Sequence, residues 1–104
     1  MSANETDSFA EVLAESDEQR VSFLKNELAL SQTFSALAAT HYKAGNPASA
    51  ERSMSDAEEA YATVARFLSD PKHSKRLTEE QVRNITAELE RLRDRLDGLR
   101  PKPT

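Results

Sequence analysis

Glycine and proline, the residues that most readily interrupt helices, are confined to three short places in this chain. The 104 residues include only two glycines and four prolines, which lie at 45–47, at 71 and at 98–103. Long stretches rich in Ala, Glu, Arg and Leu lie between these places, and such residues have high helix propensity. The spacing of the breakers therefore predicts an all-α chain with helices over about 17–44, 47–69 and 78–98.

The residues at the breakers also predict how the helices are joined. Gly45 suits a left-handed C-cap, Asn46 an N-cap, and Pro47 the first position of the next helix. Because so short a connection brings consecutive helices side by side, the first two are expected to be antiparallel neighbours. The run 70–77 is expected to be a connecting loop, and the Thr-Glu-Glu-Gln capping box at 78–81 predicts the start of the third helix.

Apolar residues in the second and third segments alternate at spacings of three and four, the pattern of packed helices. The predicted seams are Ala50, Met54, Ala57, Tyr61, Val64 and Leu68, then Val82, Ile85, Leu89, Leu92, Leu96 and Leu99. Leu24, Leu28, Phe34, Ala38 and Tyr42 are expected to join this core from the first segment.

The first segment differs because it carries two apolar stripes. One comprises Val21, Leu24, Leu28, Ala38 and Tyr42, and the other Phe23, Leu30, Phe34, Leu37 and His41. Two stripes predict a helix that either packs against both of its own neighbours or presents one stripe to another chain.

These patterns predict an antiparallel three-helix bundle over 16–99, opened by a second capping box at 16–19. Residues 1–15 form an acidic N-terminal segment, which is expected to be flexible or to form a short helix. Residues 100–104 are expected to be a frayed C-terminus.

Composition excludes several kinds of chemistry. The chain has no cysteine, which excludes disulfides, cysteine-ligated zinc, iron–sulfur clusters and thiol catalysis. With two glycines it has no phosphate-binding glycine loop, and no His-x-x-x-His or Glu-x-x-His pair supplies a metal site in a bundle. We therefore expect no cofactor, no metal and no enzymatic activity.

His41 provides the one alternative from the enzyme class. Histidine phosphotransfer domains are helical bundles that carry an exposed histidine with a lysine three and a glycine four residues on. Gly45 stands at the second of these positions, whereas Lys43 is only two residues from His41 and lies on another face of the helix. A histidine that caps the helix or borders the core is the alternative interpretation.

Charge sets expectations for partners and location. The net charge of −4 disfavours nucleic acid as a partner. No apolar run approaches the roughly 20 residues of a membrane span, and the polar start of the chain does not resemble a secretory signal. A cytoplasmic location is therefore expected.

The third segment is mildly basic, and we predict that Arg83, Arg91 and Arg95 bind an acidic partner. Helical spacing also predicts ion pairs between Glu79 and Arg83, Glu88 and Arg91, and Glu90 and Arg93.

The stretch from 37 to 68 resembles a tetratricopeptide helix pair, since Leu37, Ala38, Gly45, Ala50 and Ala57 stand at matching spacings. Together with one more leucine-rich helix it also resembles a microtubule-interacting-and-transport (MIT) domain. Both resemblances imply a groove between helices that binds a peptide or another helix.

Three functions follow as expectations. The leading one is a non-catalytic protein–protein interaction module that receives a helix or peptide in a groove beside the second and third helices. The second is a homodimer or larger homo-oligomer, assembled through the extra stripe of the first helix. The third is phosphotransfer through His41.

Overall fold

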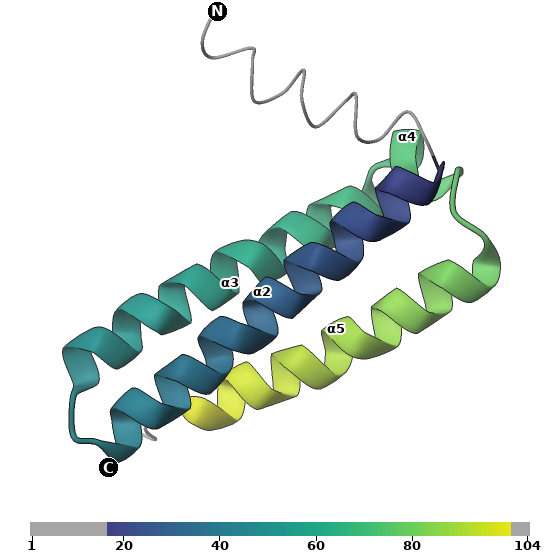
Figure 1. Cartoon of the computed structure of the whole chain (residues 1–104). Helices are drawn as coiled ribbons and strands as arrows, with labels where there is room; N and C mark the ends of the chain where they lie inside the picture. Colours follow the sequence, from purple (N-terminus) through teal and green to yellow (C-terminus); the bar gives the residue numbers. More distant parts are fainter. Residues whose placement is uncertain (1–16, 101–104) are drawn as a thin grey trace, which may run out of the picture.

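The computed structural model describes residues 17–100, and every element within this range is helical. Four helices follow one another along the chain (Figure 1): α2 (Asp17–Lys43), α3 (Pro47–Ser69), α4 (Pro71–Ser74) and α5 (Glu79–Leu99). The predicted all-α class and the three long helices are confirmed. The predicted acidic segment 1–15, Ser16 of the predicted capping box and residues 101–104 of the predicted frayed C-terminus lie outside the described residues.

The turn between α2 and α3 forms as its three residues predict. Gly45 has a φ of 73°, the left-handed conformation that a side chain would strain. Asn46 accepts a hydrogen bond from the backbone N–H of Ser49, and Pro47 is the first residue of α3. Since only three residues separate the two helices, α3 returns antiparallel alongside α2 (Figure 1).

The connection over 70–77, which was predicted to be a loop, contains a single helical turn, α4. The prediction was therefore incomplete. The Asp70 side chain accepts from the N–H of Lys72 at 3.0 Å, and Pro71 occupies the first helical position. His73 of this turn stacks on Phe67 with ring centroids 3.7 Å apart. Arg20 of α2 donates from Nε to His73 Nδ1 at 3.5 Å. These contacts with α2 and α3 stabilise a turn that is too short to persist alone.

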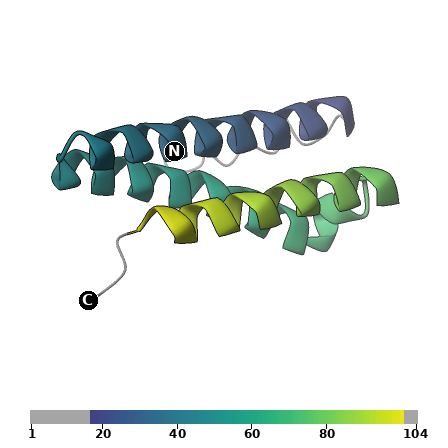
Figure 2. The same cartoon turned by 90° about the horizontal axis from the view of Figure 1, so that it is seen from below.

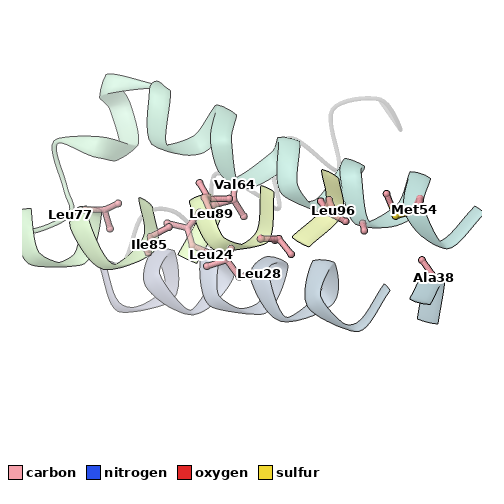
Figure 3. Packing of buried hydrophobic residues seen from close by; sticks show 11 residues of the cluster. Leu24, Leu28, Ala38, Met54, Val64, Leu77, Ile85, Leu89 and Leu96 are labelled. Atoms are coloured by element: carbon pink, nitrogen blue, oxygen red, sulfur yellow. The ribbon is translucent and has the colours of Figure 1, made fainter. Parts of the chain in front are cut away.

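The core lies where the apolar seams meet (Figure 3). Val64 of α3, Leu89 of α5 and Leu24 of α2 lie close together in this view. The predicted residues that are fully or nearly fully buried are Leu24, Leu28, Ala38, Ala50, Met54, Ala57, Val64, Ile85, Leu89, Leu92 and Leu96. The others pack against this cluster while partly exposed: Phe34, Tyr42, Tyr61, Leu68, Val82 and Leu99. Leu77 is a buried member that the seams did not include.

Small side chains form the contact between α2 and α3. Ser31 and Ser35 are fully buried on α2, and α3 carries a run of small buried residues that includes Ala57 and Ala60. Ser31 Oγ donates to the carbonyl oxygen of Ala57 at 2.8 Å. Such a bond between a side chain and the backbone of a neighbouring helix requires a close approach of the two helices. The small residues allow that approach because they leave little bulk between the helix backbones.

Helix α5 lies alongside α2 and α3, as Figures 1 and 2 show from two directions. Its start is fixed by the predicted capping box: Thr78 N–H donates to Gln81 Oε1 at 2.9 Å, and Gln81 N–H donates to Thr78 Oγ1 at 3.0 Å. The contacts of α2 with α5 are much less extensive than those of α2 with α3. Two helices therefore form a tight hairpin, and the third rests on it.

Candidate functional site

An arginine–carboxylate cluster joins α5 to α3. Arg93 donates from Nη1 and Nη2 to the two carboxylate oxygens of Glu58, both at 2.7 Å, and also reaches Asp97 Oδ1 at 2.8 Å. Its guanidinium lies 5.1 Å from the ring centroid of Tyr61. The predicted pair between Glu90 and Arg93 is therefore wrong, because a carboxylate on the neighbouring helix offers bidentate geometry that an i, i+3 pair does not.

The other two predicted ion pairs are also not formed. No contact within 4 Å joins Glu79 to Arg83 or Glu88 to Arg91 in residues 17–100. All the arginines involved are exposed, and an exposed pair contributes little free energy while costing side-chain entropy.

The cluster predicts an acid-sensitive contribution to stability. The hydrogen bonds from Arg93 hold the pKa of Glu58 below its usual value. Since a lowered folded-state pKa means that folding favours the charged form, this contribution is present above the unfolded-state pKa and is lost as the pH falls through the folded-state value. We expect Glu58→Gln to lower the melting temperature at pH 7 by about 2–4 °C, the shift that roughly 0.5 kcal/mol produces in a small domain.

Thermal unfolding followed by circular dichroism from pH 7 to about pH 3 provides the measurement. The wild type should lose more stability over this range than Glu58→Gln does. Glu90→Gln serves as the matched control, since Glu90 is exposed and makes no ion pair in the described chain. Equal acid dependence in the wild type and Glu58→Gln would contradict the assignment.

Two of the three predicted partner-binding arginines border a groove between α2 and α5. This arginine groove has a volume of about 240 Å³ and is lined by Gln32, Glu88, Arg91, Leu92 and Arg95. Arg91 and Arg95 are exposed, whereas Leu92 is buried. The sequence predicted a partner-binding groove beside the second and third helices. The arginine groove lies instead beside the first and third, α2 and α5. Gln32 of α2, which the sequence analysis did not single out, forms part of its wall.

Arg83 does not line the arginine groove. It lies eight residues before Arg91 on α5, about 12 Å along the helix axis at 1.5 Å per residue. The three arginines therefore do not form one site.

A second groove lies between α2 and α3. It has a volume of about 360 Å³ and is lined by Glu27, Leu30, Phe34, Asp56, Glu59, Ala60 and Thr63. We call it the acidic groove, because three of these residues are carboxylates and none is basic. Leu30 and Leu37 of the second α2 stripe are 46% and 42% exposed. The stripe is thus partly unpartnered, whereas Phe23 and Phe34 pack against the core cluster.

His41 lies in the last turn of α2 and is partly buried. Its backbone carbonyl accepts a hydrogen bond from Asn46 at 2.9 Å, within the turn that ends the helix at Gly45. Within residues 17–100 the imidazole makes no hydrogen bond to a side chain that could act as a base. Phosphotransfer through His41 stays a prediction.

Metal sites and membrane-spanning helices are not found among the described residues. Among residues 17–100, no three His, Asp or Glu side chains are grouped so as to hold a metal ion. None of the helices in this range combines the length and apolar character needed to cross a membrane. The two grooves beside α2 are candidate binding features.

Comparisons with protein-family models, with curated proteins and with solved structures find no match for this chain. The tetratricopeptide resemblance rests on Leu37, Ala38, Gly45, Ala50 and Ala57, and the MIT resemblance on 44–46, 50–57 and Tyr61. Both stay predictions.

Proposed function

We propose that residues 16–99 act as an antiparallel three-helix bundle whose role is non-catalytic protein–protein interaction. In this proposal the bundle receives a helix or peptide in a groove between two of its helices. The observation that carries it is the arginine groove, in which Arg91 and Arg95 stand one turn apart beside the apolar side chain of Leu92.

The arrangement suits a segment that carries carboxylates. Arg91 makes no ion pair within the described residues, and neither does Arg95, so the two guanidinium groups are available to a partner. Glu88 lies on the same side of the groove, and it favours a binding register in which the carboxylates of the partner stay away from the Glu88 carboxylate. An acidic segment is therefore the proposed occupant of this groove.

The test uses a synthetic amphipathic helix with leucines at helical spacing and glutamates on its flanks. The wild type is expected to bind this peptide, and Arg91→Glu to weaken binding at least tenfold, as measured by titration calorimetry. Arg83→Glu is the matched control, because it makes the same charge change on the same helix outside the groove.

An equal loss in Arg83→Glu and Arg91→Glu would show that net charge alone drives binding and would contradict the groove assignment. Unchanged binding in Arg91→Glu would contradict it as well.

A further inference from the structure

The acidic groove differs in character from the arginine groove and lies on the other side of α2. Leu30 lines the acidic groove and Gln32 lines the arginine groove. Residues two apart on a helix are rotated by about 200°, so these side chains leave α2 in nearly opposite directions. A ligand in one groove therefore does not occupy the other.

Apolar side chains form the floor of the acidic groove. Leu30 is 46% exposed, and Phe34 of α2 and Ala60 of α3 lie beside it. Leu37 continues the same stripe two turns further along α2, with 42% of its surface exposed. Phe23 and Leu37 are 14 positions apart, which corresponds to about 21 Å along the helix axis. That length matches a partner helix of about four turns.

Carboxylates surround this floor. Glu27 lies on α2, and Asp56 and Glu59 lie one turn apart on α3. Within residues 17–100 none of the three forms an ion pair or a side-chain hydrogen bond. The two arginines of α3, Arg52 and Arg66, donate to the hydroxyls of Ser49 and Thr63.

The charged form of one of these carboxylates is less favoured than it would be in water. Partial burial, together with the nearby charge of Glu59, raises the pKa of Glu27 above its usual value. A cation placed in the groove would reduce both effects, because it offers Glu27 a partner and compensates the charge of Glu59.

A second copy of this chain fits the groove poorly. The groove lies near the middle of α2, since Leu30 is the central residue of Asp17–Lys43. In a twofold dimer the same patch of each subunit faces its counterpart. Such a dimer would bring Glu27, Asp56 and Glu59 of both copies together, and like charges at an interface oppose association.

From these observations we propose that the acidic groove is a docking site for a basic amphipathic helix. The partner presents apolar side chains at i, i+3 or i+4, and i+7 to Leu30 and Phe34. Its flanking lysines or arginines pair with Glu27, Asp56 and Glu59. Apolar contact supplies affinity, and the carboxylates select for basic partners.

The test uses a 14-residue helical peptide with leucines at helical spacing and lysines on both flanks. The wild-type full chain is expected to bind it, and a peptide with glutamate in place of lysine is expected not to bind in this groove. Backbone amide shifts in two-dimensional NMR should change along α2 from 23 to 37 and along α3 from 56 to 67, and not at Arg91.

Two variants separate the apolar from the electrostatic contribution. Asp56→Lys combined with Glu59→Lys should weaken binding at least tenfold, and Leu30→Gln at least fivefold. Glu90→Lys combined with Asp94→Lys is the matched control, because it makes the same net change in charge on the outer face of α5. All the substituted residues are exposed, so the helical content should stay unchanged.

Three results would overturn the proposal. The first is the absence of binding by the wild type. The second is an equal loss of affinity in both double variants, which would mean that net charge alone attracts the peptide. The third is a dimer in light scattering that Leu30→Gln converts to a monomer, since a second copy would then occupy the groove.

Discussion

Leu96→Ala is expected to destabilise the protein more than any other single truncation considered in this structure, by about 2–5 kcal/mol. Leu96 lies on α5, is fully buried and belongs to the cluster shared by the three long helices (Figure 3). Its removal forfeits the transfer free energy of the side chain and leaves a cavity that the surrounding helices fill only in part. Small domains are typically stable by only about 5–15 kcal/mol, so the loss is a large share of the total.

Urea unfolding followed by circular dichroism measures this effect, with the midpoint and the slope both recorded. Leu37→Ala is the matched control, because it makes the same chemical change at a side chain that is 42% exposed. We expect the control to cost no more than about 1 kcal/mol. If Leu96→Ala cost as little as the control, α5 would not pack on the hairpin as the structure shows.

The second large effect is expected from enlarging a buried side chain at the contact between α2 and α3. Ala57 is fully buried, and its carbonyl oxygen accepts the hydrogen bond from Ser31 Oγ. Ala57→Leu adds three carbon atoms between two closely packed backbones. The helices must separate or the side chains must leave their preferred rotamers, which costs about 1–3 kcal/mol. Separation also leaves the buried hydroxyl of Ser31 without its acceptor.

Ala36→Leu on the exposed side of α2 is the corresponding control, since both changes replace alanine by leucine, a good helix former, in the interior of a helix. The control is expected to change the free energy of unfolding by no more than about 0.5 kcal/mol. A double variant that also carries Ser31→Ala should be less destabilised than the sum of the single changes, because the two residues share one contact. Additive losses would contradict the shared contact.

Local chemistry made the helix boundaries predictable. The first hairpin turn depends on three consecutive residues, and each has one strong preference: the left-handed conformation at Gly45, capping at Asn46 and a fixed φ at Pro47. The capping box at Thr78 and Gln81 is equally local. The hydrogen bonds at these helix ends join residues no more than five positions apart along the chain, so no tertiary contact was needed to infer them.

Ser31 and Ser35 are core residues that the apolar periodicity of α2 did not include. The first stripe of α2 advances by alternating steps of three and four residues through Leu28, Ser31, Ser35 and Ala38. The spacing alone identifies both serines as members of the seam, although their polarity argued against it. They are buried because Ser31 donates to a carbonyl of α3 and Ser35 to the carbonyl oxygen of Gln32, so neither hydroxyl loses its hydrogen bond on leaving water.

The candidate sites were only partly predictable. Arg91 and Arg95 were identified from the basic character of the third segment, and spacing on one helix places them one turn apart. The acidic groove was not identified, because Glu27 and Glu59 are 32 residues apart in the sequence. A carboxylate pair that forms between two helices has no signal in the periodicity of either one.

The sequence by itself determined the all-helical class, the ends of α3 and the start of α5, and the residues of the apolar seams, because capping and helical periodicity act over one or two turns. The tertiary structure decided which helices and side chains lie next to one another. It placed Arg93 against Glu58 rather than Glu90, folded a single turn into α4 against Phe67, and created one basic and one acidic groove on opposite sides of α2. These outcomes depend on how helices that are distant in sequence are rotated and spaced against one another. The volumes and charges of the side chains set this rotation and spacing only once the helices pack together.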